Sequence, residues 1–492
     1  MVTFGLLLTV GLFFWIYFLW SRRRLYKLLL KLPGPLGLPI LGIALEYIVF
    51  NKLRMRLRSK YLDKYGSTVL MWMGPMPMII TRDPNVIKEV VLSSECINRS
   101  SQVTGPVAGS FGHGLFSLEA QRWMERRKQL NPAFKHTTLT SFLPIFNAEV
   151  NTLMGILDSY IGQGEKRIRH DIIKWSFRVA TQTTVGTDVQ QDKAFQDDTI
   201  LKSYEWLMNI ITVDVIATVT RNKLVSRLVG LEARRAESLA NINGFISQII
   251  EKKLSSKPES GDQPELNSVI NRSIELHRKG EMPLDEVRGE CCLMVAAAFE
   301  TSGLTVCHAL ALLAMFPEYQ QTVYEELKDI FPNAGKFDIT YEDIQKMVYL
   351  ERVVYETLRL IPSIPLAPRE TIQDFRLSSG VVIPKGVSIG IDIFSTHRNK
   401  EYWGPDAENF NPDNFLPDNV RDRHPYAYIP FTKGKRNCIG WQYALMSSKL
   451  ALAKILRNYR VSSTFRYEDL DFVDNIGMVL AQEPGVSFHR RT

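Results

Sequence analysis

The chain has 492 residues, 45% hydrophobic and 23% charged, a composition typical of a globular protein and not of a disordered or fibrous one. No repeat of fixed period and no long low-complexity tract is visible, which argues against a solenoid or a propeller. The net charge of +8 suits an anionic membrane surface or an acidic protein partner. Nucleic acid is disfavoured, because no arginine-rich patch is interleaved with aromatic residues.

The five cysteines are odd in number and form no CxxC pair, so neither a disulfide framework nor a zinc site is indicated. For four of them the simplest interpretation is a buried thiol in a reduced, cytosol-facing chain: Cys96, Cys291, Cys292 and Cys307. Cys438 differs because of the residues around it.

The N-terminus begins with an uncharged apolar run, Phe4 to Trp20, close to the lower limit for crossing a bilayer, which takes about 20 residues. Arg22, Arg23 and Arg24 follow it, and positive charge stays on the cytoplasmic side. A cleaved signal peptide is the main alternative, but it would need a basic segment before the apolar run. We therefore predict a transmembrane signal anchor over 1–21 and a basic, Pro/Gly-rich linker over 22–42.

Residues 43–492 are predicted to form a single large catalytic domain. Two short β-prone runs come first, at Val69–Met73 and Pro77–Ile80. Long helical patterns then dominate, for example over 142–161 and 170–186. The pattern predicts a fold that is mainly α with small β-sheets.

The longest helical pattern, Leu284 to Phe316, follows a polar stretch at 253–267 that reads as an exposed loop. Its middle, Cys291 to Phe299, is apolar all round, as in a helix buried in the core of a large protein. A second membrane span is the alternative, although Glu290 and Glu300 shorten the apolar stretch below spanning length.

The strongest chemical signal is the stretch FTKGKRNCIG, from Phe431 to Gly440. Glycines at 434 and 440 let the backbone pass close to a flat, bulky group, and Arg436 can offset nearby anionic groups. Backbone amides in such a turn can donate to the Cys438 sulfur and tune a bound metal. A lone buried cysteine in a glycine-rich loop is the alternative, but the joint pattern FxxGxRxCxG is far more specific.

This stretch resembles the haem-binding loop of the cytochrome P-450 family, in which a cysteine is the axial ligand of the haem iron. The resemblance implies the family's fold, a thiolate-ligated haem b, Cys438 as the metal ligand, and Phe431 and Arg436 as cofactor-binding residues. It also implies a monooxygenase that inserts one atom of O₂ into a lipophilic small molecule, with electrons that originate from NADPH.

A helical pattern carries Glu356 and Arg359, three residues apart and so on one helix face. Alone this would be an ordinary surface ion pair. Before the cysteine loop it resembles the family's buried structural ExxR motif, which an arginine in a PERF-like segment usually completes. Here Asn414 stands in place of that arginine.

The long helix contains Ala297-Ala298-Phe299-Glu300-Thr301, where a buried carboxylate is costly without a purpose or a partner. Reductive O₂ cleavage needs two protons, and an acid beside an alcohol can relay them, so Glu300 and Thr301 are the predicted catalytic pair. The segment resembles the family's (A/G)GxET motif, with Ala298 in place of glycine. A threonine that merely satisfies the helix backbone is the alternative. Some relatives, the fatty-acid ω-hydroxylases, carry a glutamate at position 297 that can esterify the haem, so Ala297 predicts haem that is not ester-linked.

Trp123 and Arg127, four apart, share a helix face and resemble the family's WxxxR pair, which supports a haem propionate. By the same resemblance Arg369 and Arg436 are the other propionate partners. A solvated cation is the alternative for each arginine.

The resemblance, most like insect relatives of the family-four ω-hydroxylase group, also implies partners. They are an NADPH–cytochrome reductase, cytochrome b5 as a second candidate, membrane lipid and a fatty acid, hormone or foreign compound. We expect the chain in the endoplasmic reticulum membrane, with a single pass and its catalytic domain in the cytosol. The proposed reductase-docking face comprises Arg122, Arg126, Lys128, Lys433 and Lys435.

The substrate space is expected to lie near lipid, and the apolar segment Tyr204 to Val219 reads either as a membrane-facing helix or as packed core. Family analogy places seven residues at the pocket wall: Phe111, Phe116, Val295, Phe299, Ile364, Leu366 and Met478. Two other classes remain open, a haem-thiolate isomerase or dehydratase on the same fold and a non-enzymatic haem carrier.

Overall fold

The computed structural model describes residues 12–13, 15–38, 41–49, 54–186, 198–255 and 267–491. Most of the predicted anchor therefore lies outside the described residues, although residues 12–13 and 15–21 are helical. Most of the predicted loop at 253–267 lies outside them too. Its first residues belong instead to a helix that continues to Ser255.

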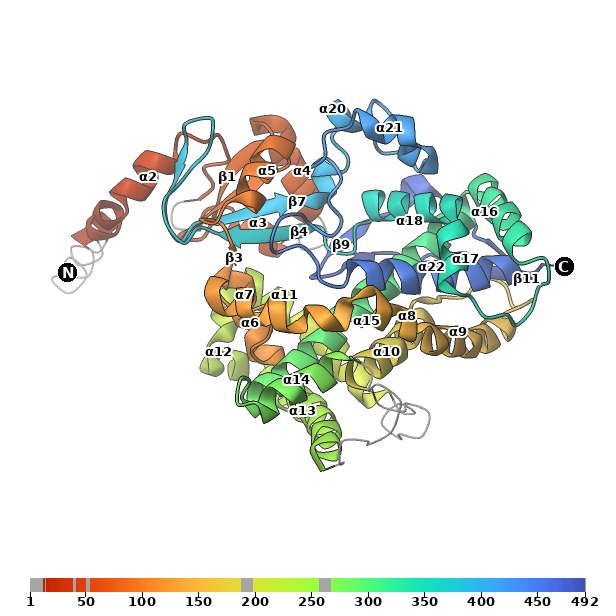
Figure 1. Cartoon of the computed structure of the whole chain (residues 1–492). Helices are drawn as coiled ribbons and strands as arrows, with labels where there is room; N and C mark the ends of the chain where they lie inside the picture. Colours follow the sequence, from red (N-terminus) through yellow and green to blue (C-terminus); the bar gives the residue numbers. More distant parts are fainter. Residues whose placement is uncertain are drawn as a thin grey trace.

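A five-stranded sheet forms one side of the body (Figure 1), in the order β1-β2-β7-β4-β3. The predicted strand pair is confirmed: β1 and β2 are antiparallel, and Trp72 is paired with Pro77 across the turn. Strand β7, far along the chain, adds in parallel to β2. The bounds are β1 Thr68–Met73, β2 Met76–Thr81, β3 Asn98–Arg99, β4 Leu366–Glu370 and β7 Ser388–Asp392.

Three two-stranded sheets complete the β-structure of the described residues. They pair β5 (Phe375–Arg376) with β6 (Val382–Ile383), β8 (Tyr459–Ser462) with β11 (Ser487–Arg490), and β9 (Phe472–Asp474) with β10 (Met478–Leu480).

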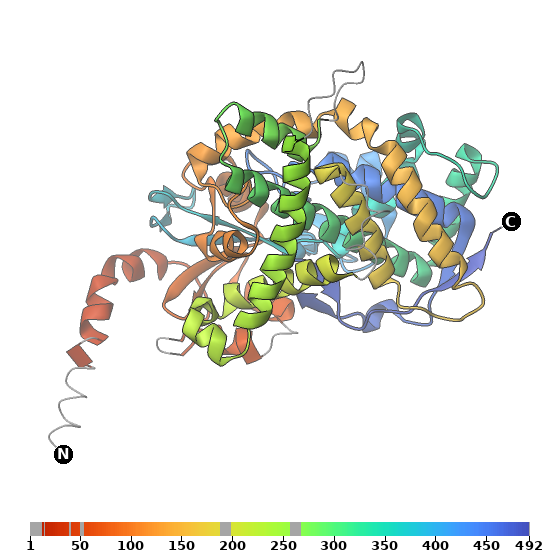
Figure 2. The ribbon, with the colours of Figure 1, turned by 90° about the horizontal axis from the view of Figure 1, so that it is seen from below.

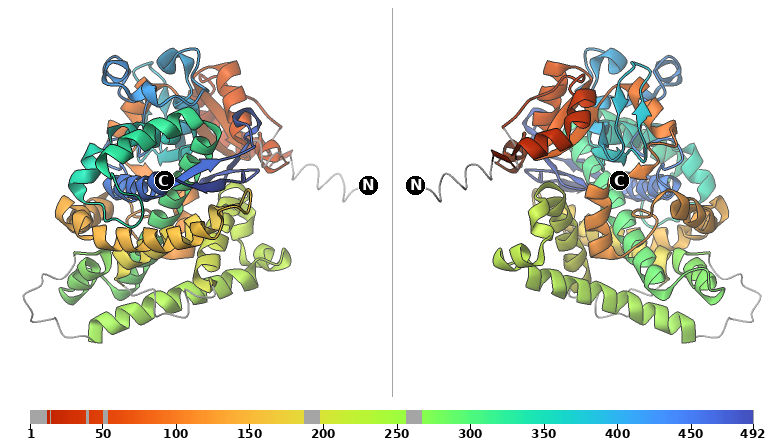
Figure 3. Two further views of the ribbon diagram at one scale, coloured as in Figure 1. Left: turned by 90° about the vertical axis from the view of Figure 1, so that its right-hand side faces the viewer. Right: turned by 90° about the vertical axis from the view of Figure 1, so that its left-hand side faces the viewer.

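Helices make up the rest of the body, so the predicted fold class, mainly α with small sheets, is confirmed. Two views from other sides show α13 lying across the outside of the helical part (Figures 2 and 3). The α-helices are α2 Arg23–Leu29, α3 Ala44–Val49, α4 Arg54–Tyr65, α5 Pro84–Leu92, α6 Ser101–Phe111, α7 Ala120–Leu130, α8 His136–Ser141, α9 Leu143–Asp158, α10 Arg169–Val185, α11 Thr199–Ile216, α12 Lys223–Leu228, α13 Glu232–Ser255, α14 Val269–Arg278, α15 Leu284–Met315, α16 Pro317–Ile330, α17 Tyr341–Lys346, α18 Val348–Leu360, α19 Ile393–Thr396, α20 Lys400–Trp403, α21 Pro417–Arg421 and α22 Trp441–Asn458. Short 3₁₀ turns are η2 Asn131–Phe134, η4 Thr218–Arg221, η5 Pro412–Phe415 and η6 Tyr467–Asp469.

Helix α15 runs through the middle of the core, which is why its sequence is apolar all round. By length and composition it could cross a membrane, but most of its apolar window is buried inside the protein. Its Gly303 lets α10 approach, because a methyl group there would lie 2.8 Å from the Ile173 Cδ1 atom. The core-helix interpretation is therefore confirmed.

Candidate functional site

The cysteine loop is a tight turn that leads directly into α22. The Cys438 amide donates to the Phe431 carbonyl at 3.0 Å, and the Asn437 amide to that of Gly434 at 3.2 Å. The Gly440 amide lies beside the Cys438 sulfur and favours its thiolate form. Burial raises the pKa of the Cys438 thiol, while this amide and the nearby guanidinium groups of Arg99 and Arg127 oppose the rise.

Gly434 seats this turn on the C-terminal end of α5. Its φ of +78° lies in the left-handed region that glycine adopts without strain. A Cβ atom at this position would lie 2.1 Å from the Val91 carbonyl oxygen, well inside van der Waals contact. The turn therefore fits only with glycine.

Four guanidinium groups, the arginine cluster, lie near Cys438: Arg99, Arg127, Arg369 and Arg436. Burial and mutual repulsion lower the pKa of Arg99 to about 10 and that of Arg436 to about 9, and hold that of Arg369 well below its usual range. Among the described residues these four arginines form no ion pair with an acidic side chain. The cluster is a concentration of uncompensated positive charge.

Sequence reasoning found three members of this cluster and missed Arg99. Arg99 stands opposite Arg369 in the pairing of β3 with β4, and its guanidinium lies 4.2 Å from the centre of the Phe116 ring. A two-residue strand gives too short a pattern to recognise in a sequence. The position of Arg99 opposite Arg369 becomes visible only when the pairing of β3 with β4 is known.

The predicted residues Trp123 and Arg127 also lie at this cluster. The Arg436 guanidinium stacks 4.3 Å above the buried Trp123 ring and donates to the Leu118 carbonyl at 2.6 Å. Arg127 donates to the backbone carbonyl and the side-chain oxygen of Asn437, at 2.9 and 3.1 Å. Both contacts join α7 to the cysteine loop.

The arginine cluster fits a flat cofactor with two carboxylates, such as haem with its propionates. In the described part of the chain four buried guanidinium nitrogens have no acceptor: Arg99 Nε, Arg369 Nη2, and Nε and Nη1 of Arg436. A buried charged donor without a partner is costly, and two carboxylates would satisfy these donors. One bound cofactor could thus contact the Cys438 sulfur through its metal and the arginine cluster through its carboxylates.

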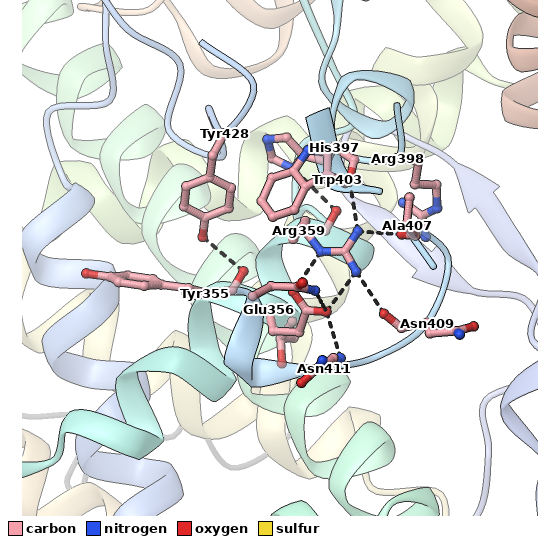
Figure 4. Close-up of polar contacts among 12 residues, drawn as sticks. Tyr355, Glu356, Arg359, His397, Arg398, Trp403, Ala407, Asn409, Asn411 and Tyr428 are labelled. Atoms are coloured by element: carbon pink, nitrogen blue, oxygen red, sulfur yellow. Dashed lines mark hydrogen bonds and ion pairs between the residues drawn. The ribbon is translucent and has the colours of Figure 1, made fainter. Parts of the chain in front are cut away.

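A second charged cluster holds the segment before the cysteine loop and is fully paired (Figure 4). Glu356 and Arg359 on α18 are wholly buried and joined by two hydrogen bonds of 2.7 Å each. The remaining Arg359 donors reach backbone carbonyls of His397, Ala407 and Asn409. The predicted pair of Glu356 and Arg359 is therefore part of a buried network and is not a surface ion pair.

Asn414 joins this network by its amide. Its Nδ2 donates to Glu356 at 3.1 Å, beside a bond from the Asn411 backbone. Asn414 carries no charge, but a cation lies nearby on Arg423. The Arg423 guanidinium lies 3.8 Å from the centre of the Trp403 ring and donates to the Asn414 carbonyl at 3.0 Å.

Helix α15 opens a short accessible stripe in the middle of the core. Between 289 and 314 its residues are buried except for five: Ala297, Ala298, Glu300, Thr301 and Cys307. The Thr301 hydroxyl donates its proton to the Ala297 carbonyl at 2.8 Å. The hydroxyl proton is therefore used by the helix backbone, as the alternative interpretation expected. The lone pairs of the hydroxyl oxygen remain available to accept.

Glu300 is a carboxylate in a poorly hydrated place. Burial raises its pKa to about 7, with Arg169 opposing the rise and Glu205 adding to it. Its Oε2 atom is buried and finds no partner among the described residues. Within them it shares no hydrogen bond with Thr301, because adjacent helix residues point in different directions.

A cavity of about 20 Å³ lies one turn further along α15, enough for about one water molecule. Cys307, His308, Arg169 and Glu483 line it. Two of these lining residues carry buried nitrogens without partners in the described chain, His308 Nδ1 and Arg169 Nε.

The seven predicted wall residues separate into two groups. Phe116, Ile364 and Leu366 are half-buried, as expected beside an open space. The other four pack into the core: Phe111, Val295, Phe299 and Met478. Phe111 stacks on Tyr204 of α11 and Phe299 meets the same ring edge-on. One face of the segment 204–219 is therefore core, whereas Asn209, Val213 and Val219 are exposed.

One part of the predicted docking face is wrong. Arg126 is buried and paired with Glu286 at 2.7 Å, and Arg122 also pairs with Glu286. Lys128 and Lys435 are exposed. Lys433 is half-buried and donates to the Pro425 carbonyl.

Comparison with known proteins gives matches along nearly the whole chain. The sequence model described as cytochrome P-450 matches residues 32–488. The chain is 65% identical to Probable cytochrome P-450 313a3 and 54% identical to Probable cytochrome P-450 313a2, both of Drosophila melanogaster, over 492 residues and the full length of each protein. It is 31% identical to Cytochrome P-450 4c21 of Blattella germanica over 493 residues, 96% of either chain.

Proposed function

Because this chain belongs to the cytochrome P-450 family and is therefore a haem-thiolate monooxygenase with a haem b cofactor, we propose that Cys438 ligates the iron and that the arginine cluster holds the propionates. The observation that carries this proposal is the set of buried, unpaired guanidinium nitrogens beside the Cys438 loop. The bound group supplies O₂ activation and oxygen transfer to the substrate.

The chain's own contribution to the chemistry is proton delivery from Glu300. A carboxylic acid with a pKa near the working pH both gives and regains a proton readily. Thr301 holds its hydroxyl proton on the Ala297 carbonyl, so its oxygen accepts a hydrogen bond from water at the accessible stripe. Arg169 and Glu205 are the charged groups that act on Glu300, and Glu205 in turn feels the exposed His170.

The substrate is a lipophilic small molecule, a fatty acid, hormone or foreign compound. Support comes from Ala297 and Ala298 on the accessible stripe of α15 and from the half-buried Phe116, Ile364 and Leu366. We place the entrance near lipid, since α3 contacts α11, which leads through η4 to α12. This edge exposes large apolar side chains: Leu45, Ile48, Val213, Val219, Leu224, Leu228 and Val229.

We further propose that the chain resides in the endoplasmic reticulum membrane, with residues 1–21 as the anchor, 22–42 as the linker and 43–492 as a catalytic domain in the cytosol. Residues 15–21 are helical and lead away from the body, whereas α2 packs Leu29 into the core beside the sheet (Figure 1). In the segment 15–21, Ile16 and Trp20 are both 57% exposed. Retention in the membrane pellet after alkaline carbonate extraction is expected, and release into the supernatant would contradict the anchor.

Electrons are proposed to come from an NADPH–cytochrome reductase, with cytochrome b5 as a second donor, docking on the exposed Lys128 and Lys435. Replacing both with glutamate should raise the KM for reductase, because like charge opposes an acidic partner. Lys328→Glu on α16 is the matched control. An unchanged KM in the double variant would rule out this face.

The deciding experiment is the absorption spectrum of the reduced, carbon monoxide-bound protein for wild type and Cys438→Ala. A strongly red-shifted Soret band is expected in the wild type and should vanish in the variant. Cys307→Ala, which removes another half-buried thiol, should keep the band. Retention of the band in Cys438→Ala would refute the assigned ligand.

A further inference from the structure

We propose that Glu290 is a positioning residue whose carboxylate clamps the loop between α6 and α7 onto α15, fixing one wall of the substrate space. The loop is defined as Gly112–Leu118. The proposal rests on the proposed function for its consequence, but the clamp itself is a feature of the chain alone.

Glu290 is buried at 0% exposure, and both of its oxygens accept from the Leu115 backbone amide, at 3.1 and 3.0 Å. The nearest cation, Arg126, is paired with Glu286 one turn earlier. Burial raises the pKa of Glu290 to about 7, and the bond from the Leu115 amide and the charge of Arg126 oppose this rise. The target of the Glu290 carboxylate is therefore the loop and not an arginine.

Close backbone packing makes this clamp rigid. A Cβ atom at Gly289 would lie 2.5 Å from the His113 carbonyl oxygen, and one at Gly112 would lie 2.9 Å from the Gly289 Cα atom. A Cβ atom at Gly114 would meet Leu293 Cδ2 at 3.0 Å. The loop backbone thus rests directly on the helix, and Glu290 closes the contact from the helix side.

The loop connects the core to the arginine cluster. Phe111, just before the loop, stacks on Tyr204 of α11 with ring centres 5.6 Å apart. At the other end Phe116 lies beneath the Arg99 guanidinium, and the Leu118 carbonyl accepts from Arg436. One buried carboxylate therefore sets the position of the half-buried Phe116 wall and of two members of the arginine cluster.

A carboxylate at this place has no other assigned duty. It lies ten residues before Glu300 and off the accessible stripe of α15, so it takes no part in proton delivery. An apolar residue would fill the same core space, but it would leave the buried Leu115 amide without an acceptor, which is destabilising. Holding that amide is the function that the geometry assigns.

The test compares Glu290→Leu with Glu290→Gln by hydrogen exchange of the holoenzyme, read on peptides covering 112–118. Loss of the acceptor in Glu290→Leu should speed exchange there by roughly tenfold or more, whereas Glu290→Gln keeps a carbonyl acceptor and should stay within about threefold of wild type. Glu286→Gln, one turn away, is the matched control and should leave 112–118 unchanged. Unchanged exchange in Glu290→Leu, or an equal rise across the whole protein, would overturn the clamp.

A second readout tests the wall. The affinity of the haem ligand 4-phenylimidazole, whose ring must fit beside the loop, should fall several-fold in Glu290→Leu, while that of the smaller imidazole should hold. An equal fall for both ligands would mean that Glu290 acts on the cofactor site and not on the wall. Failure of the proposed function would show separately, as absence of the carbon monoxide band in wild type, and the exchange result would still decide the clamp.

Discussion

The protein holds two clusters of buried positive charge that differ in one respect. Arg359 is surrounded by Glu356 and three backbone carbonyls, so all its donors are used. The arginine cluster beside Cys438 has several buried donors with no acceptor in the described chain. Arg359 is neutralised by its own chain, whereas the arginine cluster has no acidic partner among the described residues and is left with charge that a bound group can neutralise.

Breaking the completed network should have the largest effect. Glu356→Ala leaves Arg359 buried without its countercharge, which should lower the free energy of unfolding by about 3–5 kcal/mol. Chemical denaturation of the holoenzyme measures it. Asp418→Asn breaks the exposed pair with Arg421, and this control should cost less than about 1 kcal/mol. Similar losses in the two variants would erase the distinction between the clusters.

Glu300 extends the comparison to an incompletely satisfied carboxylate. Its pKa rises from 4.5 unfolded to about 7 folded, so its contribution to folding becomes less favourable as pH rises from 4.5 through 7. Glu300→Gln should therefore raise the free energy of unfolding by up to about 3 kcal/mol at pH 8, and by less as pH falls. Thermal unfolding between pH 6 and pH 8 measures this gain.

The same variant should lose about 100-fold or more in product formed per unit time, because its amide cannot supply a proton. If Glu300→Gln is more stable than wild type but inactive, the unsatisfied carboxylate of Glu300 is needed for activity and not for folding. A gain that does not change with pH would contradict the assigned cause.

Removing a member of the incomplete cluster should have the opposite pattern to Glu356→Ala. Arg369→Met deletes a buried cation repelled by Arg99 and Arg436, so the haem-free chain should be no less stable than wild type. The haem dissociation rate should increase by roughly tenfold, as expected for a lost hydrogen bond to a charged group. Stopped-flow haem transfer measures it, and a stability loss without faster dissociation would place Arg369 in the fold.

The smallest effect is expected at Asn414. Asn414→Ala removes one bond to Glu356, which also accepts from Arg359 and the Asn411 amide, so the loss should be about 1 kcal/mol. Asn414→Asp should be worse, because it sets a second carboxylate against Glu356. Denaturant midpoints of the two variants compare them, and a harmless aspartate would mean that the amide bond contributes nothing.

Much of this could be predicted from the sequence, because local patterns fix local structure. The strand pair around Gly74-Pro75 and the long core helix follow from period and turn residues, whereas the loop of Cys438 is identified by its resemblance to a family motif. Arg99 and the burial of Arg126 could not be foreseen, since both depend on partners far along the chain, Arg369 and Glu286.

Side-chain direction was also beyond the sequence. Phe299 lies two residues from Ala297, yet it packs on α10 and α11 while Ala297 faces the accessible stripe. Glu300 and Thr301 are adjacent but point in different directions, for the same helical reason. Such facts need the neighbouring elements in place.

The close fit of Gly434 against α5 has an evolutionary consequence. A clash with a side chain can be relieved when drift shortens that side chain, so a lost glycine is often recoverable by a second mutation nearby. Here the obstacle is the carbonyl oxygen of Val91, which every amino acid carries. No replacement at position 91 can make room, so descendants of this chain that keep the turn must keep the glycine, however far the rest of α5 diverges.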